Sequence, residues 1–79
     1  MLHSAVKYAR DGDGTVENQK FEAQILENTD LSRIEFSEVE FVRCRFVNCN
    51  FSNAFFYECR LERCDFCNCR NWRSFLSDL

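Results

Sequence analysis

The chain has 79 residues, enough for one small domain with a modest core. Its net charge of −3 gives no strong case for direct binding of nucleic acid or of an anionic membrane surface. No apolar run reaches transmembrane length, and residues 1–10 lack the apolar core of a signal peptide, so we expect a cytoplasmic protein without membrane association.

Residues 1–10 carry Leu2, Val6 and Tyr8 with few polar breaks. Such a segment could form a short helix or a short strand that covers the start of the domain, and its periodicity does not decide between them. We assign residues 1–18 to an irregular N-terminal segment or cap.

Residues 11–21 read DGDGTVENQKF and resemble the middle of a calcium-binding EF-hand loop. If Gly14 is aligned with the invariant glycine of that loop, the first position falls on Ala9 and the twelfth on Lys20. The loop needs a carboxylate at the first position and a bidentate glutamate at the last. We therefore expect an exposed Asp-Gly turn here and no bound metal.

A five-residue period runs through residues 29–68, where every fifth residue is Phe or Leu. These central residues are Leu31, Phe36, Phe41, Phe46, Phe51, Phe56, Leu61 and Phe66. Two residues before each lies Thr or a small or medium apolar residue, namely Thr29, Ile34, Val39, Cys44, Cys49, Ala54, Cys59 and Cys64. The period is too regular to be chance, and it indicates a repeat architecture.

Five residues is the period of neither an α-helix nor a long strand. The apolar spacing alternates between two and three residues. A gap of two keeps both side chains on one face of a short extended piece, and the remaining residues must turn the chain so that the next pair faces the same interior. A chain that turns the same way every five residues is a solenoid.

These residues resemble the pentapeptide-repeat family, whose unit has a central Phe or Leu and a small residue two positions earlier. The resemblance covers residues 29–68 cleanly and residues 19–78 more loosely. It implies an all-β fold, a right-handed quadrilateral β-helix with four units per coil and about three coils over residues 19–70. Residues 20 apart should then stack at about 4.8 Å, which places Lys20, Glu40 and Arg60 in one column.

Two departures from the apolar pattern carry information about local structure. Gln19 and Gln24 take the inward small position of the first coil, where we expect their amides to lie near an open end. The last position of several units is asparagine, which tolerates left-handed turn geometry better than most residues. These asparagines are Asn28, Asn48, Asn53 and Asn68.

Six cysteines in a short chain could indicate either a disulfide framework or a metal site. Five of them occupy the inward small position, where cysteine serves as a small apolar residue. The Cys64–Cys67 spacing invites a zinc interpretation, but Cys67 should face outward, away from Cys64 and Cys69. We expect no zinc and a partly exposed thiol at Cys67.

Residues 71–79 break the pattern and form a predicted C-terminal cap or dimerisation segment. Trp72, Phe75, Leu76 and Leu79 add apolar surface near one end of the solenoid, and an uncapped solenoid end invites association. We expect them to take part in a protein interface.

One outward face of the predicted solenoid combines four acidic residues, no basic residue and three aromatic rings. Its members are Glu35, Ser37, Glu38, Phe55, Tyr57, Glu58, Phe75, Ser77 and Asp78. Exposed aromatic patches with polar rims often mark interfaces, so Phe55 and Tyr57 join the predicted interface residues.

No catalytic constellation is present, and the only histidine, His3, has no partner nearby in the sequence. We therefore expect no enzymatic activity and no cofactor. The predicted function is a non-catalytic interaction module that forms a homodimer, with room for an unidentified protein partner. The alternative, implied by the family resemblance, is a mimic of duplex DNA that binds a bacterial type II topoisomerase such as gyrase.

Overall fold

A computed structural model of the protein describes residues 1–71. One helix, α1 (Leu2–Asp11), precedes strands of three residues each. In chain order these strands are β1 (Thr15–Glu17), β2 (Lys20–Glu22), β3 (Ile25–Glu27), β4 (Glu35–Ser37), β5 (Glu40–Val42), β6 (Arg45–Val47), β7 (Phe55–Tyr57), β8 (Arg60–Glu62) and β9 (Asp65–Cys67).

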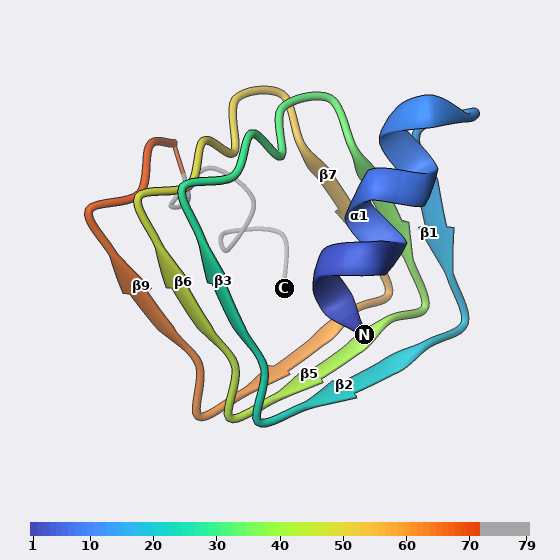
Figure 1. The fold of residues 1–79 in the computed structure, drawn as a ribbon. Coiled ribbons are helices and arrows are strands. Elements are labelled where there is room, and N and C mark those ends of the chain that lie inside the picture. Colours follow the sequence, from blue (N-terminus) through green and yellow to red (C-terminus); the bar gives the residue numbers. More distant parts are fainter. Residues whose placement is uncertain (72–79) are drawn as a thin grey trace.

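The strands stack into three parallel sheets, ordered β1-β4-β7, β2-β5-β8 and β3-β6-β9. Every pairing joins residues 20 apart, as in Phe21 with Phe41 and Phe46 with Phe66. A fourth side is held by the single bridges Asp30–Asn50 and Asn50–Arg70. The chain therefore winds through a four-sided coil every 20 residues (Figure 1), which confirms the predicted quadrilateral β-helix.

Each corner of the coil contains a residue with positive φ, repeated every five residues from Asn18 to Asn68. The four asparagines predicted to form turns lie at such corners, with φ between 50° and 60°. Other corners use residues that adopt this conformation less readily, among them Ala23, Arg33 and Arg43. A repeated left-handed residue turns the chain in the same sense at every corner, which is what a five-residue repeat must achieve.

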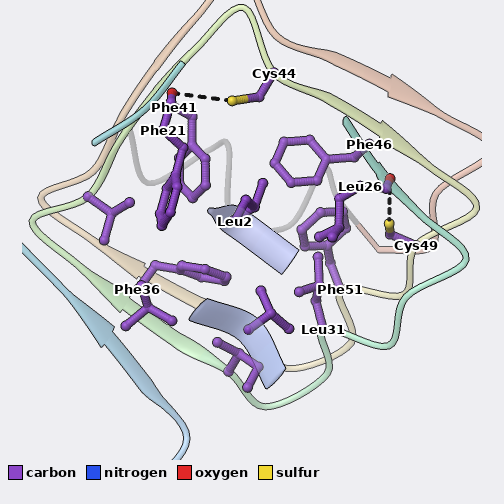
Figure 2. Packing of buried hydrophobic residues seen from close by; sticks show 14 of the residues in the cluster. Leu2, Phe21, Leu26, Leu31, Phe36, Phe41, Cys44, Phe46, Cys49 and Phe51 are labelled. Carbon is purple, nitrogen blue, oxygen red and sulfur yellow. Dashed lines mark hydrogen bonds between the residues drawn. The ribbon is translucent and has the colours of Figure 1, made fainter. Parts of the chain in front are cut away.

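The core is a column of aromatic rings enclosed by the four sides (Figure 2). Phe36 stacks on Phe56 with ring centroids 4.7 Å apart, and Phe46 stacks on Phe66 at 5.1 Å. Rings of one coil also meet edge to face, as Phe41 and Phe46 do at 5.7 Å. The predicted central residues are buried from Leu31 to Phe56, whereas Leu61 and Phe66 in the last coil are only half-buried.

Helix α1 covers the interior at the N-terminal end of the first coil (Figures 1 and 2). Leu2, Val6 and Ala9 lie on one helical face and are almost fully buried against the aromatic core. The backbone N–H of Leu2 donates to Oε1 of Gln24 at 3.4 Å, which satisfies one of the unpaired donors at the helix start.

The two inward glutamines therefore differ. Gln24 is half-buried beneath the helix start and donates from Nε2 to the Glu22 carbonyl at 3.2 Å. Gln19 is exposed and lines the groove beside α1 at this end of the solenoid. Helix α1 packs mainly against β1 and β3.

The five inward thiols have a common hydrogen-bonding role. Each sulfur lies within hydrogen-bonding distance of the carbonyl 23 residues earlier, in the preceding coil, and of the carbonyl two residues earlier, so its single proton is shared between the two. For Cys44 the distances are 3.3 Å to Phe21 O and 3.6 Å to Val42 O. The same pair of contacts recurs at Cys49, Cys59, Cys64 and Cys69. Cysteine here is both a small apolar residue and a weak donor that ties one coil to the next.

The outward charge column has the predicted register, with Glu40 between Lys20 and Arg60, and Arg45 is paired with Asp65 in the same way. Within residues 1–71, however, the only ion pair with a nitrogen–oxygen distance below 4 Å is that of Arg10 with Asp30. The stacked charges are thus neighbours in solvent rather than closed salt bridges, and each adds only a small favourable interaction.

Candidate protein-interaction surface

The sheet β1-β4-β7 forms one flat side of the solenoid, here called the acidic-aromatic face. Its outward side chains form two columns of residues 20 apart. One column is Thr15, Glu35 and Phe55, and the other is Glu17, Ser37 and Tyr57. The remaining outward positions are the corner residues Asn18, Glu38 and Glu58, which all have positive φ.

The two aromatic rings of this face point outward because the residue between them points inward. Phe56 is 6 % exposed and stacks in the core, so its neighbours in the strand must face solvent. Phe55 is 55 % exposed and Tyr57 is 49 % exposed. Two large rings on one short strand are unusual surface residues, and their burial by a partner would be favourable.

The charge of the face is one-sided. Its outward positions carry four glutamates at 17, 35, 38 and 58 and no lysine or arginine, and all four are exposed. The neighbouring side formed by β2, β5 and β8 carries basic residues as well as acidic ones; the basic ones are Lys20, Arg43, Arg60 and Arg63. The molecule therefore has an uneven charge distribution although its net charge is small.

Helix α1 extends this surface beyond the first coil. A shallow groove lies between the helix and the first strand, lined by residues that include Met1, Tyr8 and Glu17. Met1 and Tyr8 are each 83 % exposed. Of the large apolar side chains exposed within residues 1–71, only Ile25 lies away from the acidic-aromatic face and this groove. The apolar exposed surface of the described chain is thus concentrated on one side.

Comparison with known families agrees with the stacked geometry. The family described as Pentapeptide repeats matches residues 20–53 and 44–70, with eight copies of the repeat. The chain belongs to the pentapeptide-repeat family. No curated protein and no solved structure gives a significant match to it. The family is generally non-enzymatic.

In this pentapeptide-repeat protein, the structure brings together two of the predicted interface residues, Phe55 and Tyr57, on one strand. The other four, Trp72, Phe75, Leu76 and Leu79, lie outside the described residues, as do Ser77 and Asp78 of the predicted face. Sequence reasoning did not place Met1 and Tyr8 beside this face. The available signal was the helical spacing of Leu2, Val6 and Ala9, which puts Tyr8 on the outer side of α1.

The other motifs singled out in the sequence have structural roles. Asp13 Oδ1 accepts from the Thr15 N–H at 3.1 Å, and Gly14 has a φ of +80°, so DGDG forms a turn between α1 and β1. Over residues 1–71, no group of three or more His, Cys, Asp or Glu side chains lies together in an arrangement that could hold a metal ion. All six cysteines are free thiols, and Cys67 is the exposed one.

Proposed function

We propose that this protein is a non-catalytic interaction module that binds other proteins and pairs with a second copy of itself. The observation that carries the proposal is the gathering of exposed aromatic and apolar side chains on the acidic-aromatic face and the adjacent α1 groove. A monomeric soluble protein rarely keeps such rings exposed on a flat sheet without a use for them. Tyrosine and other aromatic residues are enriched where interfaces are buried.

Self-association is supported by the C-terminal end of the described coil stack. Leu61 and Phe66 are half-buried, whereas Phe41 and Phe46, which occupy the same columns one coil earlier, are fully buried. Within residues 1–71, β7, β8 and β9 each have a neighbouring strand on one side only. Apolar side chains beside strand edges favour pairing with another chain, and a two-fold homodimer is the commonest solution.

In this proposal the dimer buries the end coil together with the apolar residues of the C-terminal segment, Trp72 and Phe75 among them, near Phe55 and Tyr57. Light scattering in dilute, neutral, reducing buffer tests it directly. The expected mass is about twice the chain mass of 9.4 kDa. A double Trp72→Ser, Phe75→Ser variant should be monomeric. Ile25→Ser provides the control, because Ile25 is an exposed apolar residue on a different side, and this variant should remain dimeric.

A wild-type mass of one chain at micromolar concentration, unchanged in the double variant, would contradict self-association. The acidic-aromatic face would then remain for a foreign protein. Loss of the dimer in Ile25→Ser as well would show that the contact lies elsewhere.

Mimicry of duplex DNA toward a type II topoisomerase is the second candidate, and the four glutamates of one face favour it. This candidate is less well supported than the first. A protein surface that mimics duplex DNA must be acidic along its length, whereas Arg43, Arg45 and Arg63 are exposed on the other sides of the solenoid. Inhibition of gyrase supercoiling by micromolar protein would raise this candidate above the first. Charge-reversed Glu35→Lys protein would serve as its control.

We also propose a cytoplasmic location. The inward thiols serve as free hydrogen-bond donors to backbone carbonyls, a role that suits a reducing compartment. Fractionation with an antibody against the chain would test this placement.

A further inference from the structure

Two pairs of cysteines repeat at the same corner of successive coils. Cys64 lies one coil beyond Cys44, and the Asp65 N–H donates to the Cys44 carbonyl at 3.0 Å, so the two backbones are hydrogen-bonded at this corner. Cys69 lies one coil beyond Cys49 in the same way, with the Arg70 N–H donating to the Cys49 carbonyl at 2.9 Å. All four thiols take the inward position (Figure 2 shows Cys44 and Cys49).

The sulfur atoms of each pair are displaced by one coil. Cys44 Sγ lies 3.3 Å from Phe21 O, and Cys64 Sγ lies 3.4 Å from Phe41 O, which is the same contact 20 residues later. Because stacked strands are about 4.8 Å apart, the two sulfur atoms of a pair are separated by about that distance. Burial and then the neighbouring Cys64 thiol raise the pKa of Cys44, which agrees with sulfur atoms that face each other.

This separation matches a metal ion held between two sulfur atoms. A metal–thiolate bond measures about 2.3 Å for zinc, so two such bonds in line span about 4.6 Å. Two ligands are too few for zinc, which takes four in a structural site. They are sufficient for Cu(I), a soft cation that thiolates select and that forms linear two-coordinate complexes.

We propose that the stacked pairs Cys44/Cys64 and Cys49/Cys69 are two separate two-thiolate sites for Cu(I). On binding, two S–H bonds break, the two protons leave to solvent and two Cu–S bonds form, so that the bound Cu(I) dithiolate carries a net charge of −1 and no electron is transferred. The S–H···O=C contacts between coils are replaced by a covalent link between the same coils. The site would therefore tie neighbouring turns of the solenoid together as well as hold the ion.

The donor set gives the selectivity of such a site, because two thiolates are the ligands that a soft cation such as Cu(I) prefers. Cys64 and Cys69 are half-exposed, which gives the ion a way in, while their partners below are buried.

Cys59 provides a matched control within the same molecule. It occupies the same inward position, is half-buried, and donates to Phe36 O at 3.2 Å as the paired thiols do to their own carbonyls. The residue one coil before it, however, is Val39, which has no sulfur. Cys59 therefore has the same environment without a stacked thiol.

The test is an anaerobic Cu(I) titration of the full chain against a chromogenic Cu(I) chelator, in a Cys67→Ser background that removes the exposed thiol. We expect about two Cu(I) ions retained per chain, one for each stacked pair. Cys64→Ser and Cys69→Ser should each lose one ion, since serine keeps the hydrogen bond to the carbonyl but does not ligate Cu(I). Cys59→Ser should retain both ions, and X-ray absorption should show two sulfur neighbours per copper.

Cys44→Ser removes the buried ligand of the first site and should lose the same single ion as Cys64→Ser. With two variants of the same site, the test still holds if one of them fails to fold. The proposal is overturned if the parent protein retains less than one ion. It is also overturned if Cys59→Ser lowers the count as much as Cys64→Ser, or if copper has nitrogen or oxygen neighbours.

Discussion

Arg10 fastens the end of helix α1 to Asp30 on the bridged fourth side of the first coil. Its guanidinium Nη2 donates to the Asp30 carbonyl at 2.6 Å and lies 3.8 Å from the Asp30 carboxylate. The Asp30 carboxylate also accepts from the Ser32 N–H at 3.0 Å. Hydrogen bonding by Ser32, and then the charge of Arg10, lower the pKa of Asp30. The helix is thus held at both ends, by Gln24 at its start and by Asp30 at its finish.

Replacing Arg10 by alanine should loosen the helix while leaving the coils intact. The variant loses a charge-assisted hydrogen bond, a contact worth about 1.5–3 kcal/mol when well formed and less where solvent screens it. Amide hydrogen exchange over residues 2–11 should quicken, with little change over β5 and β6. Lys7→Ala, an exposed change on the same helix, is the control and should leave exchange unaltered. Equal exchange in the two variants would show that the Arg10 contact does not hold the helix.

Phe46→Ala should destabilise the protein by about 3–5 kcal/mol. Phe46 is 1 % exposed and contacts Phe41, Phe51 and Phe66, so its removal opens a cavity in the middle coil. Denaturant titration gives the difference in the free energy of unfolding. Glu27→Ala, an exposed strand residue, should cost little.

Ser52 is another position of the repeat at which the sequence pattern predicts an outward side chain, so replacing it would be expected to leave the stability unchanged. It is nevertheless unsuitable as a control for Phe46. Its hydroxyl donates to Asn50 Oδ1 at 2.6 Å and accepts from Asn71 Nδ2 at 2.7 Å. Should Glu27→Ala shift the unfolding midpoint as far as Phe46→Ala, the assignment of inward and outward positions would be wrong.

Substitutions at the corners of the coils should change the stability of the protein, because the corner residues have a left-handed backbone conformation. Ala23 has a φ of 55°, a conformation that costs an ordinary residue about 1 kcal/mol more than it costs asparagine or glycine. Ala23→Asn should therefore stabilise the protein by up to about that amount, measured by denaturant titration. The reverse change, Asn53→Ala at a corner with a φ of 60°, should destabilise it comparably. Shifts of the same sign in both variants would contradict this account.

Thiol labelling should follow exposure and pKa. Cys67 is exposed and should react first with a neutral-pH alkylating reagent. Burial raises the pKa of Cys44, Cys49, Cys59 and Cys64 above 9.0, so the reactive thiolate is scarce at neutral pH and their labelling should be slow until the protein unfolds. Peptide mapping by mass spectrometry gives the order. Early modification of Cys44 or Cys49 would be incompatible with their inward placement.

The coil architecture could be predicted because each unit repeats the same physical constraint. Phe or Leu at the centre and a small residue two positions earlier recur in phase from residue 29 to residue 68, which indicates a solenoid. The four units per coil, and with them the 20-residue register, were implied by the resemblance to the pentapeptide-repeat family. The outward direction of Phe55 and Tyr57 follows from the inward direction of Phe56. Repetition made these positions readable from the sequence alone.

The N-terminal helix could not be predicted with the same certainty. Leu2, Val6 and Ala9 have helical spacing, but a ten-residue segment with three apolar positions is also compatible with a strand. What favours the helix is the open apolar end of the first coil, a tertiary surface that exists only after the coil has formed. The start of this helix also supplies a partner for Gln24, whose Oε1 accepts from the Leu2 N–H.

The 20-residue register also limits how such a chain can change its length. Removal of a single residue from β5 would turn every later inward side chain outward, since successive strand residues face opposite ways. Removal of five residues would keep the phase but carry each later unit round to the next side, so that Arg60 would no longer lie beside Glu40. Only the gain or loss of a whole coil keeps both the core and the surface columns aligned. Stable length variants of this chain should therefore differ from it by multiples of 20 residues, that is, by complete coils.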